Sequence, residues 1–234
     1  MAVGTIDGRV QIIAPGAAAE GDQEPAPVAS ISAHAASCRA VAFGATGDVL
    51  YTAGSDGFIA VFDDQGREKT RMQVSDVAVN RILSSGEDLL FTGDDEGGVS
   101  CLDMRTGAVS MQWTEHEDYV SSLLMHEEST LLSTSGDSTL CTYDLRSHRV
   151  LRSEPQEDEL LCVEMLRSGC KIVCGALNGT MLLFSSGSHE DCSDRFPGHP
   201  AAVNCMLKVD ESTVLTGCED GLVRVLSILP NKVM

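Results

Sequence analysis

The sequence has few basic residues: 16 Lys and Arg stand against 35 Asp and Glu, which gives a formal net charge of −19. A surface this acidic repels phosphate backbones, so the composition argues against direct, charge-driven binding to RNA or DNA. It suits a basic protein partner, although a simple need for solubility explains the charge at least equally well.

Long apolar runs are also missing. No stretch of about 18 consecutive apolar residues occurs, and a membrane-spanning helix needs one. The first residues, MAVGTIDGRVQII, lack the charged start of a secretory signal peptide. They predict instead two strands around a turn.

Motifs for catalysis and metal binding are absent as well. The sequence contains no GxGxxG, GxxxxGK[ST], HExxH or GxSxG. None of its nine cysteines forms a CxxC, and Cys170 and Cys174 have no second pair at zinc-binding spacing. Several cysteines lie in apolar runs, which indicates reduced, buried thiols in an intracellular protein. We therefore expect no metal and no cofactor.

The sequence does contain a repeat. An apolar run, small residues, an acidic or amide residue, a small residue and a second apolar run recur along the chain. The acidic or amide position falls at Asp7, Asp56, Glu96, Asp137, Asn178 and Asp220. The spacing is about 40 residues except for the first interval, which contains a Pro/Gly/Ala-rich acidic stretch at 14–27. We expect that stretch to be a mobile loop.

A period of about 40 residues, with two strands around an Asp-Gly type of turn, is typical of the four-stranded blades of β-propellers. It predicts one all-β domain over 1–234, with blades at approximately 1–32, 33–73, 74–114, 115–156, 157–197 and 198–234. Three repeats open with a histidine, at His34, His116 and His199. With Asp63, Asp103 and Asp144 near the ends of repeats, the pattern resembles WD40 repeats over nearly the whole chain.

The resemblance implies a hydrogen-bonded chain in each complete blade. It would link the opening His, a Ser or Thr on the second strand, the turn Asp and a closing Trp. The corresponding residues are His34, Thr52 and Asp56; His116, Ser133 and Asp137; and His199 and Asp220. A Ser-His-Asp catalytic triad is the alternative. The repetition from blade to blade and the missing nucleophile elbow argue against it.

The closing position departs from the WD pattern, because no repeat carries Trp there. The residues at that position are Ile13, Phe62, Leu102, Tyr143, Phe184 and Leu226. The single tryptophan, Trp113, falls in an outer-strand region, and the third repeat lacks an opening His near position 75. We therefore expect irregular blades in which some networks are incomplete.

Three less conventional segments resemble the WD repeat-containing protein 55 family. They are the opening GTIDGRVQI, the segment FTGDDEGGVSCLDMRTG of the third repeat, and the C-terminal run through ILPNKV. The resemblance implies a non-catalytic scaffold of the nucleus and nucleolus that supports ribosomal RNA maturation and large-subunit assembly. It also implies a seven-bladed ring. Six turns are recognisable here, so we expect an incomplete first blade, a missing last blade, and a fragment or incomplete gene model.

Plant members of that family are also linked to the damaged-DNA-binding adaptor of cullin-4 RING ubiquitin ligases, which implies an alternative role as a substrate receptor. Two WDxR-like boxes, at 102–105 and 143–146, make Asp103, Arg105, Asp144 and Arg146 candidate contacts. The competing interpretation is that each Arg only caps the Asp of its own blade, which the weakness of exposed ion pairs favours.

The scaffold hypothesis places a protein partner on loops at the narrow face of the propeller. Ser55, Asp95 and Glu219 lie next to turn anchors and are the candidate contacts there. An enzyme is the third hypothesis. It would require a polar cluster that is not repeated from blade to blade, and the sequence shows none.

Overall fold

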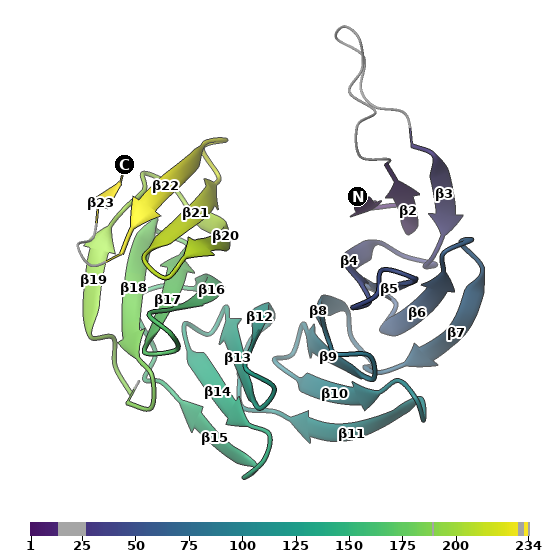
Figure 1. Cartoon of the computed structure of the whole chain (residues 1–234), viewed down its shortest axis with the longest axis horizontal. Helices are drawn as coiled ribbons and strands as arrows, with labels where there is room; N and C mark the ends of the chain where they lie inside the picture. Colours follow the sequence, from purple (N-terminus) through teal and green to yellow (C-terminus); the bar gives the residue numbers. More distant parts are fainter. Residues whose placement is uncertain (14–26, 189, 229–231, 234) are drawn as a thin grey trace, which may run out of the picture. The chain divides into compact units, whose positions relative to one another are not determined.

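The computed structural model describes residues 1–13, 27–188, 190–228 and 232–233. Most of the predicted loop at 14–27 lies outside the described residues. The described elements are all β-strands, arranged in six antiparallel sheets that follow one another along the chain (Figure 1). The predicted all-β architecture of WD-type blades is confirmed. No helix that could span a membrane occurs within the described ranges.

The sheets, here called blades 1 to 6, divide into two compact units, Met1–Trp113 and Thr114–Met234. Blade 1 contains β1 (Ala2–Gly4), β2 (Arg9–Ile12) and β3 (Ala29–Ser32). Blade 2 contains β4 (Cys38–Phe43), β5 (Val49–Gly54), β6 (Phe58–Asp63) and β7 (Glu68–Gln73). Blade 3 contains β8 (Val79–Ser85), β9 (Leu89–Asp94), β10 (Val99–Asp103) and β11 (Ala108–Trp113).

The second unit has three four-stranded blades. Blade 4 contains β12 (Val120–His126), β13 (Thr130–Ser135), β14 (Leu140–Asp144) and β15 (Arg149–Arg152). Blade 5 contains β16 (Leu160–Leu166), β17 (Lys171–Ala176), β18 (Thr180–Ser185) and β19 (Asp194–Pro197). Blade 6 contains β20 (Val203–Asp210), β21 (Thr213–Cys218), β22 (Val223–Ser227) and β23 (Lys232–Val233). Within each of the six blades, every strand pairs with the next along the chain.

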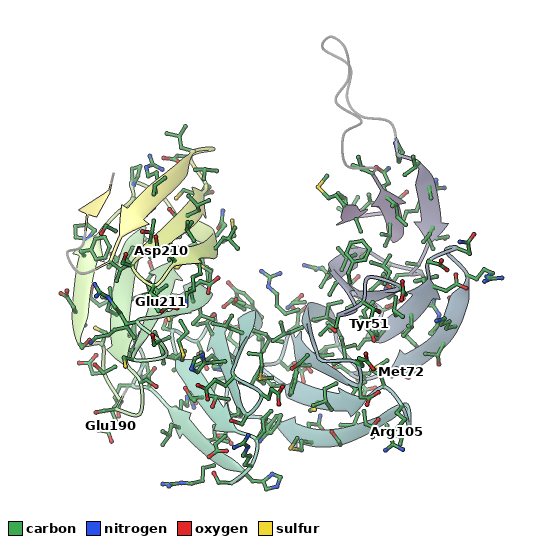
Figure 2. All side chains as sticks on the ribbon, in the orientation of Figure 1. Tyr51, Met72, Arg105, Glu190, Asp210 and Glu211 are labelled. Atoms are coloured by element: carbon green, nitrogen blue, oxygen red, sulfur yellow. The ribbon has the colours of Figure 1, made fainter. Side chains whose placement is uncertain are left out.

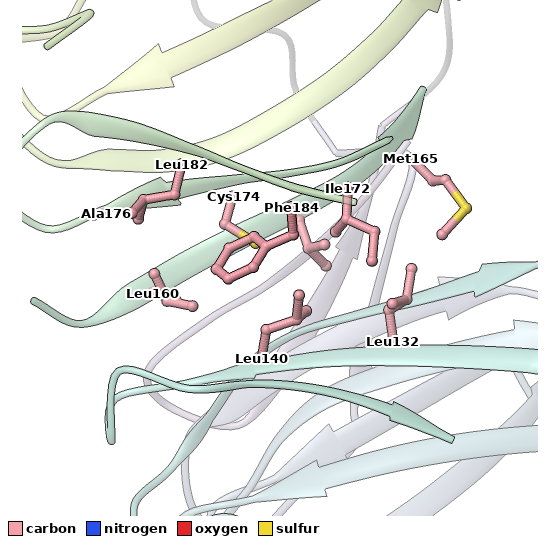
Figure 3. Packing of buried hydrophobic residues seen from close by; sticks show 10 residues of the cluster. Leu132, Leu140, Leu160, Met165, Ile172, Cys174, Ala176, Leu182 and Phe184 are labelled. Carbon is pink, nitrogen blue, oxygen red and sulfur yellow. The ribbon is translucent and has the colours of Figure 1, made fainter. Parts of the chain in front are cut away.

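The hydrophobic core lies between consecutive blades of a unit. Leu132 and Leu140 of blade 4 point toward Ile172 and Phe184 of blade 5, and all four are fully buried (Figure 3). In blades 2 to 5 the second and third strands are buried on both faces, so their sequences are nearly continuous apolar runs with weak alternation. Each such side chain stabilises the fold by about 1.5–3 kcal/mol, and the cores therefore hold each unit together.

In blades 1, 2, 4 and 5, the turn that contains the repeated acidic or amide position binds the chain as it enters the next blade. The carbonyl of Gly57 accepts the N–H of Ser75 at 3.3 Å, and that of Gly8 accepts the N–H of His34 at 2.9 Å. Gly57 has φ of 77°, and a Cβ there would lie 2.2 Å from the Ser75 carbonyl oxygen. The Asp-Gly turn thus needs glycine both for its left-handed backbone and for the close approach of the next blade.

A Gly57→Ala substitution should lower the free energy of unfolding by more than about 2 kcal/mol, because left-handed strain adds to the clash with Ser75. Gly47→Ala is the matched control. Gly47 has φ of 81° and no atom within 4 Å of the place that a Cβ would occupy, so only about 1 kcal/mol is expected. Urea denaturation of the two variants measures the difference. Equal losses would contradict the proposed contact between turn and blade.

Candidate functional site: the blade networks and the two blade ends

Blade 2 contains the complete predicted network apart from its closing residue. His34 Nδ1 lies 3.0 Å from Asp56 Oδ1, and His34 Nε2 lies 2.9 Å from Thr52 Oγ1. Asp56 also accepts the N–H groups of Phe58 and Ala35, both at 3.2 Å. The carboxylate therefore fixes its own turn and the entry loop at once. The closing residue, Phe62, packs in the core shared with blade 1.

Blade 4 has a longer network. His116 Nε2 lies 2.6 Å from Ser133 Oγ, which lies 3.2 Å from the hydroxyl of Tyr143. His116 Nδ1 lies 2.9 Å from Thr139 Oγ1 and 3.4 Å from Asp137 Oδ2. Tyr143 occupies the closing position, so its hydroxyl supplies the polar group that the missing indole would otherwise bring.

In blade 6, the structure does not bring the two predicted residues together. His199 Nε2 lies 2.7 Å from Thr216 Oγ1, but its buried Nδ1 has no hydrogen-bond partner among the residues that the structure describes. Asp220 instead accepts from the guanidinium of Arg224, at 2.6 and 3.1 Å. Arg224 stands on the third strand where blade 2 has Ala60, opposite the Ser/Thr position. A bidentate guanidinium binds a carboxylate more strongly than a neutral imidazole does.

Blade 3 replaces the histidine network with a shorter one. Ser75 stands at the opening position, and its Oγ donates to Asp94 Oδ2 at 2.9 Å. Asp94, in place of the predicted Glu96, also accepts the N–H groups of Glu96 and Gly98. Asp94 is the last residue of β9, two residues before the predicted Glu96, and its carboxylate caps the turn from the β9 side.

Blade 5 has neither the histidine nor the hydroxyl. Gln156 and Cys174 stand in their places, and Asn178 only caps its turn by accepting the N–H of Thr180 at 2.9 Å. Cys174 is fully buried, and burial raises the pKa of its thiol well above the usual value. This blade relies on apolar packing where its neighbours use hydrogen bonds.

The electrostatics of the complete networks fit a structural role. Burial lowers the pKa of His34 more than Asp56 raises it, so the imidazole is neutral at neutral pH. Burial raises the pKa of Asp137, but hydrogen bonds from His116, Thr139 and Glu117 hold it well below its usual range. The side chains of His34 and His116 are 0% exposed. Neither imidazole can reach a substrate, so the triad-like residues fix the blades rather than catalyse.

An arginine that recurs at one position of the outer strand in three blades is a feature that sequence reasoning missed. On the fourth strands of blades 2, 4 and 5 these arginines are Arg71, Arg152 and Arg195. Each pairs with the third-strand residue that lies opposite the Ser/Thr position of the second strand. Each binds the loop that enters its own blade, at Ala33 O (2.6 Å), Glu117 Oε1 (3.2 Å) and Glu157 Oε1 (2.6 Å). Their recurrence about 15 residues after each turn anchor is the signal that could have identified them.

The predicted contacts Ser55, Asp95 and Glu219 occupy one equivalent place, directly after the second strand of their blades. The backbone N–H of each donates to the loop before its blade's first strand, at 2.9, 3.0 and 3.0 Å. The Ser55 hydroxyl lies 2.9 Å from that of Ser37, and Asp95 accepts a hydrogen bond from Asn80. Asp95 and Glu219 are exposed. This place therefore presents a fixed backbone with an exposed acidic side chain in blades 3 and 6.

The two WDxR-like boxes lie at the opposite end of their blades, in the turns between third and fourth strands. The turn after β10 is hydrogen-bonded to the turn before β9, because the N–H of Met104 donates to the carbonyl of Asp88 at 2.7 Å. Arg105 Nη2 donates to Asp103 Oδ2 at 3.1 Å, with the Arg side chain 71% exposed (Figure 2). The two predicted sets of partner residues thus mark two different ends of the blades.

The second box differs from the first. Asp144 accepts the N–H of Arg146 at 2.9 Å and the hydroxyl of Ser147 at 2.7 Å. Ser147 thereby occupies the carboxylate oxygen that Arg105 uses in the first box. The exposed Arg146 side chain makes no hydrogen bond or ion pair with a residue that the structure describes. Self-capping by the Arg side chain therefore holds for Arg105 and not for Arg146.

Across the described ranges, no three His, Cys, Asp or Glu side chains are grouped so that they could hold a metal ion. All nine cysteines are free, and burial raises the pKa of Cys162 to about 12. That thiol therefore stays protonated at neutral pH and is a poor nucleophile or ligand.

Replacing Asp137 by Asn should lower the free energy of unfolding at pH 7 by about 1–3 kcal/mol, because buried donors lose their charged acceptor. The folded-state pKa of Asp137 is lowered. Its contribution is therefore present above the ordinary carboxyl pKa of about 4 and is lost as the pH falls toward the folded-state value. Urea denaturation at pH 7 and at pH values below about 4 should show the difference from wild type shrinking.

Asp220→Asn is the control, since Asp220 bonds an Arg at the surface and not the imidazole of its blade. A loss for Asp137→Asn no larger than that for Asp220→Asn would contradict the larger contribution expected of Asp137, whose side chain is 7% exposed against 22% for Asp220.

The comparisons with known proteins agree on one family. A family model described as WDR55 matches residues 1–234. The chain is similar to WD repeat-containing protein 55 of Arabidopsis thaliana, 37% identical over 239 residues, which cover 100% of this chain and 67% of the relative. For the Homo sapiens protein of that name the identity is 37% over 205 residues, covering 86% and 54%.

WD repeat-containing protein JIP5 of Coprinopsis cinerea is 35% identical over 210 residues, covering 84% of this chain and 52% of the relative. The chain thus spans about half to two thirds of the length of these curated relatives. The crystal structure of the computationally designed Ika8 protein has a TM-score of 0.78 and covers 97% of this chain and 67% of that one. At 18% identity, that likeness shows the fold alone.

The repeated blades, their partly replaced networks, the match of the family model over the full chain and the identity to several relatives lead to one conclusion: the chain belongs to the WDR55 family of WD-repeat proteins.

Proposed function

We propose that the chain is a non-catalytic, protein-binding scaffold of the nucleolus that acts in ribosomal RNA maturation and large-subunit assembly. Membership of the WDR55 family supports the proposal, because the resemblance of the sequence implies that role. The observation that carries the scaffold half is the burial of the triad-like groups. With the side chains of His34 and His116 0% exposed, these polar groups stabilise blades and leave binding to the blade ends.

The ends of blades 3 and 6 at which Asp95 and Glu219 lie are the better candidates for the main partner. The backbone at both positions is fixed by a hydrogen bond to the entry loop, so an exposed carboxylate is presented without a large ordering cost. With a net charge of −19, the chain favours a basic assembly protein over nucleic acid.

The double variant Asp95→Lys and Glu219→Lys should lose most of its co-sedimentation with large-subunit precursor particles, because each change reverses a charge facing a basic partner. Asp64→Lys with Glu87→Lys is the charge-matched control, at exposed positions in turns of the opposite blade end. The measurement is gradient sedimentation of nuclear extracts with the tagged protein. Absence of the unmodified protein from these particles and from nucleoli would refute the assembly role.

A second function, substrate receptor of a cullin-4 RING ubiquitin ligase, is favoured by one observation. Arg146 is an exposed guanidinium in a WDxR-like box whose Asp144 is already bonded by the turn backbone and Ser147. Such a group can form a bidentate ion pair with an acidic groove of the adaptor without first breaking a bond of its own.

Arg146→Ala should weaken binding to the purified damaged-DNA-binding adaptor by roughly tenfold, the value of about 1.4 kcal/mol for one charge-assisted contact. Arg105→Ala is the control in the other box. It should have a smaller effect, because binding through Arg105 must first break its bond to Asp103. Surface plasmon resonance with the adaptor measures both. Unchanged affinity in the Arg146 variant would leave that box a purely structural turn.

A further inference from the structure

The outer strand of blade 4 has an open edge. β15 pairs with β14 on one side, and no strand that the structure describes pairs with its other side (Figure 1). Ser153, the residue after β15, donates its backbone N–H to the carbonyl of Leu140 at 2.9 Å. Because backbone groups alternate in direction along a strand, every second residue before Ser153 also faces β14. The N–H and C=O groups of Val150 and Arg152 therefore point away from β14.

One hydrogen bond on this open edge is already formed. By the same alternation the N–H of Glu154 points away from β14, and it donates to the carbonyl of Glu190, in the loop between β18 and β19, at 2.6 Å. A groove of about 230 Å³ lies beside the edge, far more than the about 10–15 Å³ that holds one water. The groove is lined by Val150, Leu151, Arg152, Gly187, Ser188 and Glu190. Main-chain donors and acceptors thus border a space that a peptide backbone can enter.

The sequence around this edge has a charge opposite to that of the whole chain. Residues 145–153 contain three arginines and one histidine but no carboxylate, although the net charge of the chain is −19. The guanidinium of Arg152 is held by Glu117 and Asp137. The exposed Arg149 side chain forms no ion pair with a residue that the structure describes. An acidic partner that the rest of the surface repels is therefore attracted to this edge.

The side chains of the edge define what can lie beside it. Arg149 shares one face of β15 with Leu151, which is 44% exposed, because alternate side chains of a strand lie on the same side. A strand added to the edge would bring one side chain beside Leu151 and another, two residues away, beside Arg149. An apolar residue suits the first place and a carboxylate the second. Glu190 lies at the opposite end of the edge, next to Glu154, so the carboxylate of the occupant belongs at the Arg149 end.

We propose that the open edge of β15 binds an extended segment of a partner protein in which an apolar and an acidic residue are separated by one residue. The segment adds a strand to blade 4. Its main chain bonds to Val150 and Arg152, while Leu151 and Arg149 select its side chains. A second copy of the chain is a poor occupant, because its own β15 would bring arginines beside arginines.

Two capped synthetic peptides, TTVTDTT and TTVTKTT, test the charge preference on the full chain. They differ only in the residue placed beside Arg149. Fluorescence anisotropy of the labelled peptides should show binding about fivefold tighter for the Asp peptide, since a carboxylate attracts the guanidinium and an ammonium repels it. Arg149→Glu should reverse the preference. Lys69→Glu is the matched control, at an exposed position of the outer strand β7, and should leave the preference unchanged.

Amide hydrogen exchange locates the bound peptide. The amides of Val150 and Arg152 should exchange more slowly when TTVTDTT is bound, whereas the amide of Leu151, which already faces β14, should not change. Val150→Pro removes one outward N–H and leaves the pairing with β14 intact, because proline is tolerated on an edge strand where its nitrogen faces outward. This variant should bind neither peptide at concentrations up to about 1 mM.

Circular dichroism shows whether each variant is folded. If Val150→Pro fails to fold, the reversal by Arg149→Glu and the exchange pattern decide. Equal affinity for the two peptides, slowed exchange elsewhere than at this edge, or no binding by the wild-type chain up to about 1 mM overturns the proposal. Exchange at Val150 and Arg152 that slows with protein concentration alone would identify a second copy as the occupant, and overturns it as well. The edge is separate from the blade ends considered above, so none of these results bears on the assembly role.

Discussion

The structure depends on one constraint: each blade is a small sheet with two apolar faces, and such a sheet is stable only between neighbours. An apolar sheet face left in water loses the free energy that its burial would provide, and the buried side chains here lie between blades rather than within them. The repeat period and the glycine-dependent contact between a turn and the next blade both follow from this requirement. Cooperative packing of neighbours, not any single bond, carries most of the stability.

The polar networks are secondary to that packing, which explains how freely they vary. Blade 2 uses His34 and Asp56, blade 3 uses Ser75 and Asp94, and blade 5 has no histidine in its network. In every turn, one side-chain oxygen accepts a backbone N–H. The oxygen belongs to an Asp or Asn, or in blade 1 to the Thr5 hydroxyl. The shared physical task is therefore turn capping, because an unpaired N–H at a blade end would cost free energy in every repeat.

Much of the fold could be predicted from the sequence, because its signals are local and repeated. The turn period located all six blades, and the first blade has three strands, as expected. The side-chain networks were less predictable, since they depend on lengths and neighbours across strands. Asp94 caps its turn in place of Glu96. The Tyr143 hydroxyl joins a network that was expected to lack a polar group at the closing position. Asp220 binds Arg224 instead of His199. Each of these results from a pairing between strands that linear spacing does not reveal.

The contact between a turn and the following blade, present within both units, has a consequence for synthesis on the ribosome. The Gly57 turn is complete before Ser75 leaves the exit tunnel, so each blade offers a docking point to the residues translated next. Within each unit, folding can then proceed in the direction of translation, with a new blade shielding the apolar face made just before it. At each stage, the exposed apolar surface that a chaperone could bind would lie on the most recently synthesised blade.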